Sequence, residues 1–93
     1  MTQRHELKTW PIYFDAVSSG DKMFEVRRND RAFQKGDLLR LIRHDGHRYC
    51  PSDTHGHELH ARITYLLQGG QFGIEPGYCV LGIEIISREE YEK

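Results

Sequence analysis

The stretch Gly20-Asp-Lys-Met-Phe-Glu-Val-Arg27 decides the fold that we predict for this chain. Apolar and charged residues alternate along it, and because a period of two is typical of a β-strand, we predict a strand over residues 22–28. Lys22 stands at the start of this strand, and Asn29-Asp30-Arg31 ends it. Opposite faces of the strand carry the apolar pair Phe24 and Val26 and the charged pair Glu25 and Arg27.

Four further strands and two helices are predicted around this strand. The strands cover residues 5–8, 38–44, 60–67 and 78–86. The first helix has Thr9 as its N-cap and Pro11 in its first turn, and Gly20 suits the position after its end. A short second helix follows Ser87, which pairs with Glu90 in a capping box. The apolar faces are expected to be Tyr13, Phe14 and Val17 in the first helix, Ala61, Ile63, Tyr65 and Leu67 in the fourth strand, and Cys79, Leu81, Ile83 and Ile85 in the fifth.

The order strand, helix, four strands, helix favours an α+β fold. We expect a mixed or antiparallel, curled sheet of about five strands with one N-terminal helix and a short C-terminal helix. The 93 residues suit a single domain over residues 1–93. No stretch approaches the roughly 18 apolar residues of a membrane span, and the polar start lacks the apolar run of a secretory signal. We therefore expect a cytoplasmic protein with no membrane partner, in which Cys50 and Cys79 are reduced.

Basic residues are concentrated in one part of the chain, although the formal net charge is only −1. Residues 22–48 contain eight lysines and arginines against four acids. This local surplus favours an anionic or polar partner at one end of the molecule, and a solvated basic hairpin is the alternative interpretation. The small net charge argues against a protein that coats nucleic acid without specificity.

Lys22, Glu25 and Arg27 are the most informative ionisable residues of the chain. A lysine beside a carboxylate keeps its charge, whereas a desolvated lysine can act as a base or a nucleophile. An arginine presents a planar fork of donors to a phosphate or to the edge of a base. Together these residue types predict a compact polar pocket, and an ion-pair ladder on the surface is the alternative.

The string Gly-x-Lys-x-x-Glu-x-Arg at residues 20–27 resembles the signature of the ASCH superfamily, whose members share a PUA-like β-barrel. A wider set of blocks resembles the bacterial and phage family known as domain of unknown function 3850. In chain order, the blocks are His5-Glu-Leu-Lys8, Tyr13-Phe14, Gly20 to Phe33, Gly36-Asp37-x-Leu39, Tyr65 to Gly70 and Gly73-Ile-Glu-Pro-Gly-Tyr78. The resemblance is specific because several multi-residue blocks recur in order, from about residue 5 to residue 86.

The resemblance implies a module that binds RNA or a nucleotide-like ligand in a cleft beside the strand 22–28. We expect no cofactor. Carried over residue by residue, the ligand-binding candidates are Lys22, Glu25 and Arg27, and next to the same blocks Lys8, Arg28, Asn29 and Asp30. Trp10 and Tyr78 are candidates for stacking on a base, but core packing is the favoured interpretation for both rings.

An enzyme is the alternative that the resemblance implies. Some ASCH relatives resemble small amidohydrolases that deacylate N4-acetylcytidine, and there the motif lysine works with a threonine. This chain has Glu25 in place of that threonine, so the enzyme hypothesis assigns catalysis to Lys22 as base and Glu25 as its partner. A phage-type domain that binds another protein is the third hypothesis, and the modest net charge suits it.

A histidine-rich loop carries the weak candidates for metal ligands. They are His44, His47, Cys50, His55 and His57, which offer the nitrogen and sulfur donors that zinc favours. We expect no metal, because their spacing matches no standard zinc finger and they lie outside the family blocks. A solvated loop that titrates at about pH 6.5 is the favoured interpretation.

Overall fold

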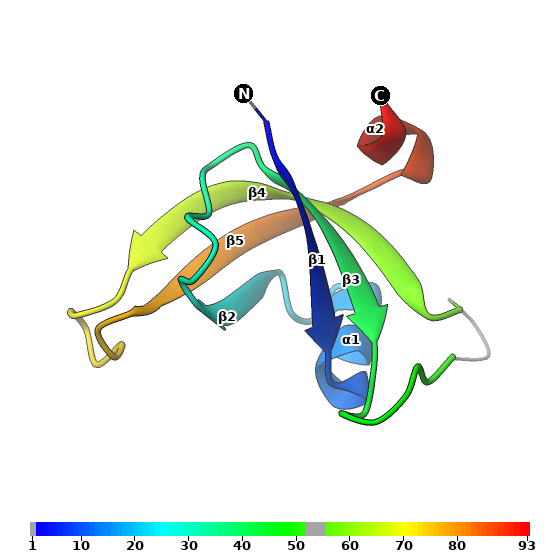
Figure 1. The fold of residues 1–93 in the computed structure, drawn as a ribbon, viewed down its shortest axis with the longest axis horizontal. Helices are drawn as coiled ribbons and strands as arrows, with labels where there is room; N and C mark the ends of the chain where they lie inside the picture. The colour runs from blue at the N-terminus through cyan, green and yellow to red at the C-terminus, as the bar shows by residue number, and fades with distance from the viewer. Residues whose placement is uncertain (1, 52–55) are drawn as a thin grey trace.

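The computed structural model describes residues 2–51 and 56–93, and in this part of the chain the elements follow the predicted order (Figure 1). The strands are β1 (Arg4–Thr9), β2 (Phe24–Arg28), β3 (Leu38–Arg43), β4 (Glu58–Gln68) and β5 (Tyr78–Ile86), and the helices are α1 (Pro11–Ser18) and α2 (Arg88–Glu92). The α+β class is therefore confirmed. Neither helix is long and apolar enough to cross a membrane, and no other helix occurs in the described residues.

A single mixed sheet has the strand order β1-β3-β4-β5-β2. β1 runs parallel to β3, and the other neighbouring strands are antiparallel. The long strands β4 and β5 arch across the molecule and curl the sheet into a half-barrel (Figure 1). Its two edges are β1 and β2, which α1 joins in sequence. The half-barrel is therefore open between the first two strands of the chain.

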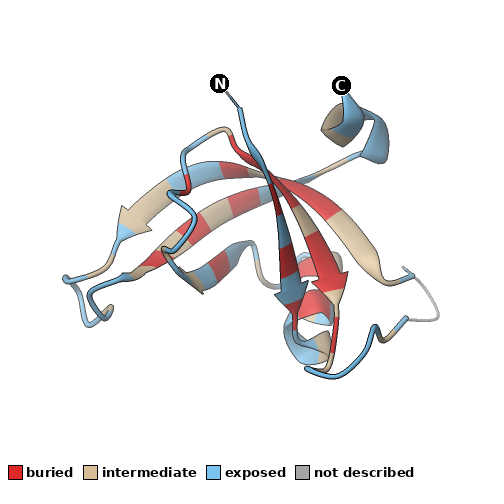
Figure 2. Ribbon diagram, viewed as in Figure 1, coloured by how far each residue is buried: buried red, intermediate tan, exposed pale blue. Residues whose placement is uncertain are grey.

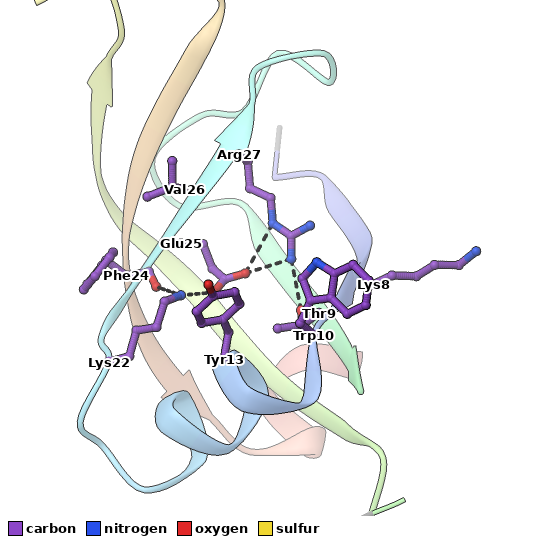
Figure 3. A pocket seen from close by; sticks show the side chains of 9 residues that line it. All are labelled: Lys8, Thr9, Trp10, Tyr13, Lys22, Phe24, Glu25, Val26 and Arg27. Carbon is purple, nitrogen blue, oxygen red and sulfur yellow. Dashed lines mark hydrogen bonds and ion pairs between the residues drawn. The ribbon is translucent and has the colours of Figure 1, made fainter. Parts of the chain in front are cut away.

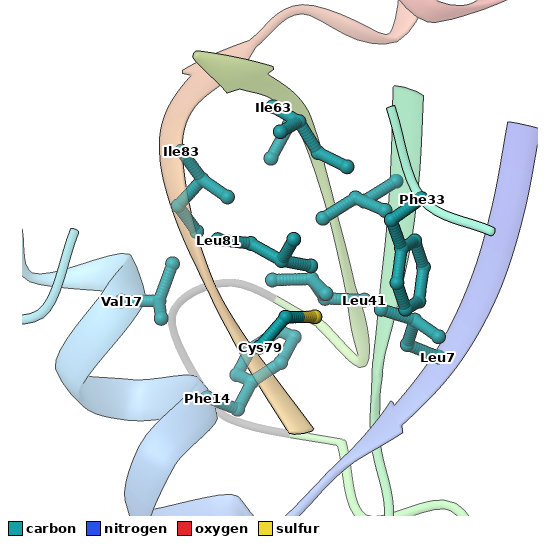
Figure 4. Close-up of a cluster of buried hydrophobic side chains, with 11 residues drawn as sticks. Leu7, Phe14, Val17, Phe33, Leu41, Ile63, Cys79, Leu81 and Ile83 are labelled. Carbon is teal, nitrogen blue, oxygen red and sulfur yellow. The ribbon is translucent and has the colours of Figure 1, made fainter. Parts of the chain in front are cut away.

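The hydrophobic core fills the inside of the half-barrel, and α1 packs over it (Figure 4). Buried residues recur at alternate positions along the strands, as the stripes in Figure 2 show. Cys79 belongs to this core, where burial raises the pKa of its thiol. Cys50 and Cys79 form no disulfide with each other. The core cluster consists of Leu7, Phe14, Val17, Phe33, Leu39, Leu41, Ala61, Ile63, Cys79, Leu81 and Ile83.

The start of α1 differs from the prediction. Trp10, not Thr9, is the N-cap residue, and Pro11 is the first helical residue. Thr9 instead continues the alternation of β1, so its side chain is buried inside the half-barrel. Phe14 faces the core as expected, but Tyr13 is half exposed, so its assignment to the apolar face was wrong. Thr9 is therefore not a helix cap, and Tyr13 is not a core residue.

Two other helix ends agree with the prediction. Gly20 has a φ of +87°, the left-handed conformation expected just after a helix. Ser87 is the N-cap of α2, and its hydroxyl accepts a hydrogen bond from the backbone N–H of Glu90 at 3.0 Å. Short-range signals thus predicted these two ends correctly.

A bulge in β4 overturns the predicted face of that strand. Ala61 and Ile63 are buried as expected, but the pairing with β5 shifts between Ile63 and Tyr65. The extra residue reverses the alternation, so Tyr65 turns outward and Leu66 packs against the core in its place. In β5, Ile85 is likewise 41% exposed rather than buried. Strict alternation of burial therefore fails from Tyr65 onward in β4 and at Ile85 in β5.

A buried carboxylate anchors the start of β3 to β1. Asp37 is 1% exposed and accepts hydrogen bonds from the His5 ring and from the backbone N–H groups of Gln3 and Gln34. Burial alone would raise the pKa of Asp37, but these hydrogen bonds outweigh it and hold that pKa below its usual range. The carboxylate therefore links the first strand and the turn before β3 in its ionised form.

Candidate functional site

Strand β2 turns its charged face inward. Glu25 is 2% exposed and Arg27 is partly buried, whereas Phe24 and Val26 are 43% and 54% exposed. The predicted alternation is confirmed, but the usual preference for burying apolar residues is reversed. In Figure 3, Glu25 and Arg27 lie on one side of β2, and Phe24 and Val26 point to the other. The charged side chains therefore face the opening between β1 and β2.

A pocket of about 540 Å³ occupies this opening. Its walls come from the end of β1, the first turn of α1 and the strand β2 with the residues just before it. We call it the motif pocket; its lining residues are Lys8, Thr9, Trp10, Tyr13, Lys22, Phe24, Glu25, Val26 and Arg27 (Figure 3). The predicted pocket around Lys22, Glu25 and Arg27 is therefore present as a geometric feature.

Glu25 lies at the centre of a chain of ion pairs. Its Oε2 accepts a hydrogen bond from Lys22 Nζ at 2.5 Å, and its Oε1 accepts from Arg27 Nη2 at 2.8 Å and Nε at 3.2 Å. Arg27 Nη2 also donates to Thr9 Oγ1 at 3.0 Å, which ties β2 to the opposite edge of the sheet. A buried carboxylate needs such partners, because an unpaired charge is costly to remove from water. The ion pairs thus fix both cations inside the pocket.

Aromatic rings surround these ions. Lys22 Nζ lies 4.9 Å from the centre of the Phe24 ring and 5.5 Å from that of Tyr13, within the range of cation–π attraction. Trp10 is 56% exposed and lines the pocket. Its indole packs closely on the turn before Tyr49, where a Cβ added to Gly46 would lie 3.3 Å from the ring. Trp10 is therefore supported by that turn without being covered.

The lining of the motif pocket has a positive balance. Three of its residues, Lys8, Lys22 and Arg27, are cationic, and Glu25 is the single acid among them. Within the described residues, Arg27 Nη1 makes no hydrogen bond to the protein, so its two N–H groups are available to a ligand. Lys8 is exposed at the rim, and its side chain extends away from the other lining groups (Figure 3). The pocket thus offers donors and rings to an anionic, planar ligand.

The remaining candidates from the sequence lie away from the motif pocket. Arg28 projects from the outer face of β2, with its guanidinium carbon 5.8 Å from the centre of the Tyr78 ring. Asn29 has a structural role: its amide donates to Gln68 and accepts from a backbone N–H in the following loop. Asp30 is exposed. The structure therefore groups four of the seven predicted ligand-binding residues and separates these three.

Sequence reasoning missed several lining residues. Thr9 and Tyr13 were assigned to a helix cap and to the core, and core packing is wrong for Trp10 as well. A signal for Thr9 did exist, because it continues the alternation set by His5 and Leu7 in β1. Trp10 was named as a candidate for stacking, but nothing in the local pattern showed that its ring and that of Tyr13 would be exposed, since this depends on where α1 meets the edge of the sheet.

The histidine-rich loop forms a small aromatic cluster. Nδ1 of His44 accepts a hydrogen bond from the Gly46 backbone N–H at 3.0 Å, and the His44 ring meets the Tyr49 ring edge-on. Tyr49 also contacts the ring of His57. The described residues, which include all the candidate ligands except His55, contain no group of three or more side chains that could hold a metal ion. The fifth candidate, His55, lies outside the described residues.

Comparison with known proteins relates the chain to proteins of undetermined function. It is 38% identical over 64 residues to an uncharacterized 12.9 kDa protein in the GpA 3′ region of Escherichia phage P2. The match covers 69% of this chain and 54% of the relative, so the chain spans about half the length of that protein. The family described as domain of unknown function (DUF3850) matches residues 4–83, which include every residue that lines the motif pocket. On this evidence the chain belongs to the DUF3850 family.

Proposed function

We propose that this protein is an RNA- or nucleotide-binding domain of the ASCH or PUA-like type, and that its ligand occupies the motif pocket. The main support is the arrangement of Lys22 and Arg27 on the buried carboxylate of Glu25, inside a pocket lined by three aromatic rings. Held cations bind an anion without first losing side-chain freedom, which is the benefit of a preorganised site. Nucleotides combine the two chemistries that the pocket offers, an anionic phosphate and a flat ring.

Each group has a role that follows from its contacts. Arg27 Nη1, which makes no hydrogen bond to the described residues, binds phosphate, and Lys8 at the rim adds a positive charge that attracts it. Trp10, supported by Gly46 on one side, provides a surface on which a base stacks. Glu25 acts as a positioning residue, because its carboxylate oxygens are engaged by the two cations that it orients.

Binding is better supported than hydrolysis. Lys22 Nζ donates both to Glu25 and to the Phe24 carbonyl oxygen at 2.6 Å, and both contacts use its N–H groups. A lysine beside a carboxylate keeps its charge, and a charged ammonium has no lone pair with which to accept a proton from a substrate or water. The amidohydrolase hypothesis can be tested directly by measuring the release of cytidine from N4-acetylcytidine by the purified protein.

The single tryptophan gives a direct test of binding. Because Trp10 lines the pocket, a stacked base should quench its fluorescence during titration with nucleoside monophosphates or short oligoribonucleotides at fixed salt. Arg27→Ala should weaken binding roughly 10- to 100-fold, as expected for lost hydrogen bonds to a charged group. Arg62→Ala is the matched control, because Arg62 pairs with Glu84 on the surface and lines neither pocket.

Two results would refute the proposal. One is the absence of saturable quenching with any of these ligands. The other is equal affinity in the Arg27→Ala and Arg62→Ala variants, which would place the ligand elsewhere on the protein.

A further inference from the structure

A second hollow lies on the outer face of the sheet. Its volume is about 260 Å³, and it is lined by Val26, Gly73, Ile74, Glu75, Tyr78 and Val80. We call it the outer hollow. Val26 lines both this hollow and the motif pocket, so only the strand β2 separates the two.

The wall between the two hollows is an unpaired strand edge. β2 pairs with β5 on one side and is the last strand of the sheet. At the two ends of the β2–β5 pairing, Ile83 N–H donates to the Met23 carbonyl and Asn29 N–H donates to the Gly77 carbonyl, and in an antiparallel pair such bonds recur at every second residue. The N–H and C=O of Val26 therefore point away from β5, toward the open edge. A ligand that passes from one hollow to the other crosses these two free backbone groups.

The outer hollow has the chemistry of a base site. Its floor is aliphatic, with Val26 directly opposite Val80, and the Tyr78 ring forms one side. Arg28 lies over that ring, exposed at the margin of the hollow. Glu75 supplies a carboxylate that can accept a hydrogen bond from the exocyclic amino group of adenine or cytosine. An apolar floor with one acceptor suits a neutral ring, and the adjacent guanidinium suits a phosphate.

We infer that the two hollows are consecutive subsites for one single-stranded nucleic acid, with β2 lying between two neighbouring bases. The inference rests on the proposed function, since the first base occupies the motif pocket. The second base occupies the outer hollow, and Arg28 binds the phosphate that links the two nucleotides. The ring-lined pocket and the apolar hollow meet at Val26, and Arg28 lies beside the hollow over the Tyr78 ring, so two bases and a linking phosphate each find a suitable group. The ligand is therefore an oligonucleotide of at least two residues.

Quenching of Trp10 fluorescence by mononucleotides and dinucleotides tests this inference. The 5′-phosphorylated dinucleotides pApA and pCpC, which carry both a terminal and a linking phosphate, should bind about tenfold or more tightly than AMP and CMP, the gain expected from one more stacked base. Arg28→Ala and Ile74→Ala should each remove most of this gain and leave the affinity for AMP within about twofold. Arg62→Ala should keep the whole gain, because its side chain lines neither hollow. Thermal unfolding of every variant checks that a smaller difference in affinity does not result from unfolding of the variant.

The outcomes separate this inference from the proposed function. If AMP binds and pApA binds no more tightly, the second subsite is refuted and the motif pocket keeps its proposed ligand. A gain that survives both Arg28→Ala and Ile74→Ala would also refute the second subsite. If neither mononucleotides nor dinucleotides bind, both proposals are wrong.

Discussion

Replacement of Lys22 by methionine should destabilise the fold, although the residue lies in a ligand pocket. The substitution keeps an unbranched side chain of similar length and removes the ammonium that donates to Glu25 at 2.5 Å. The side chain of Glu25 is only 3% exposed and that of Lys22 only 16%, so water cannot readily replace the lost partner. Part of the buried carboxylate is then left without a counter-charge.

The expected loss is about 2 kcal/mol in the free energy of unfolding. Hydrogen bonds to charged groups contribute about 1.5–3 kcal/mol, and breaking a fully buried ion pair costs about 3–5 kcal/mol. The lower part of this range applies, because Arg27 remains bonded to Glu25 at 2.8 Å. For a domain of this size, 2 kcal/mol corresponds to a fall in Tm of about 8–16 °C.

Urea and thermal denaturation followed by circular dichroism measure this loss. Lys35→Met is the matched control; it removes an exposed lysine in a turn and should change stability by less than about 0.5 kcal/mol. In a double-mutant cycle, Lys22→Met and Glu25→Gln should show a coupling of about 1–2 kcal/mol. A Lys22→Met variant as stable as Lys35→Met, or strictly additive effects in the cycle, would refute the assigned role of the ion pair.

Three further predictions follow from particular contacts. Gly46→Ala should increase the quenching of Trp10 fluorescence by acrylamide, because the new Cβ would crowd the indole and φ at this position is +96°; an unchanged quenching constant would contradict the packing. Gly69→Ala should cost about 1–3 kcal/mol or more in urea denaturation, since its Cβ would meet a backbone carbonyl oxygen, and a variant of full stability would disprove that close approach. Stability should fall as the pH drops below about 6.5, because burial lowers the pKa of His60 despite the opposing charge of Glu58, so that the unfolded chain takes up the proton first. His60→Gln should flatten this part of the pH profile, and a slope equal to that of the wild type would count against the assignment.

Strand β2 shows which features of the site the alternation of residues in a strand can predict. The pleat of any strand places alternate side chains on opposite faces, so the separation of Glu25 and Arg27 from Phe24 and Val26 followed from the sequence. The sequence pattern did not show which of the two faces points inward. The charged face is buried because Lys22 and Thr9 supply partners there, and those partners come from outside the strand.

The bulge in β4 illustrates a second limit. Alternation predicted the buried positions up to Ile63 and failed from Tyr65 onward. The shift depends on how β4 fits the curved strand β5, and Gly82 of β5 leaves room beside Tyr65, whose Cβ would lie 3.4 Å from a Cβ added there. The bulge depends on the fit between two strands, so the alternation of apolar and polar residues within either strand does not reveal it.

The sequence by itself determined the order of the strands and helices, two of the helix ends and the grouping of Lys22, Glu25 and Arg27. These features depend on contacts between residues that are close in the chain. Only the tertiary structure decided that β1 and β2 become the two edges of one sheet, which brings Thr9 within 3.0 Å of Arg27 and opens a pocket between them. Strand order is set by long-range pairing and by the curvature of the whole sheet, and no short stretch of residues encodes either.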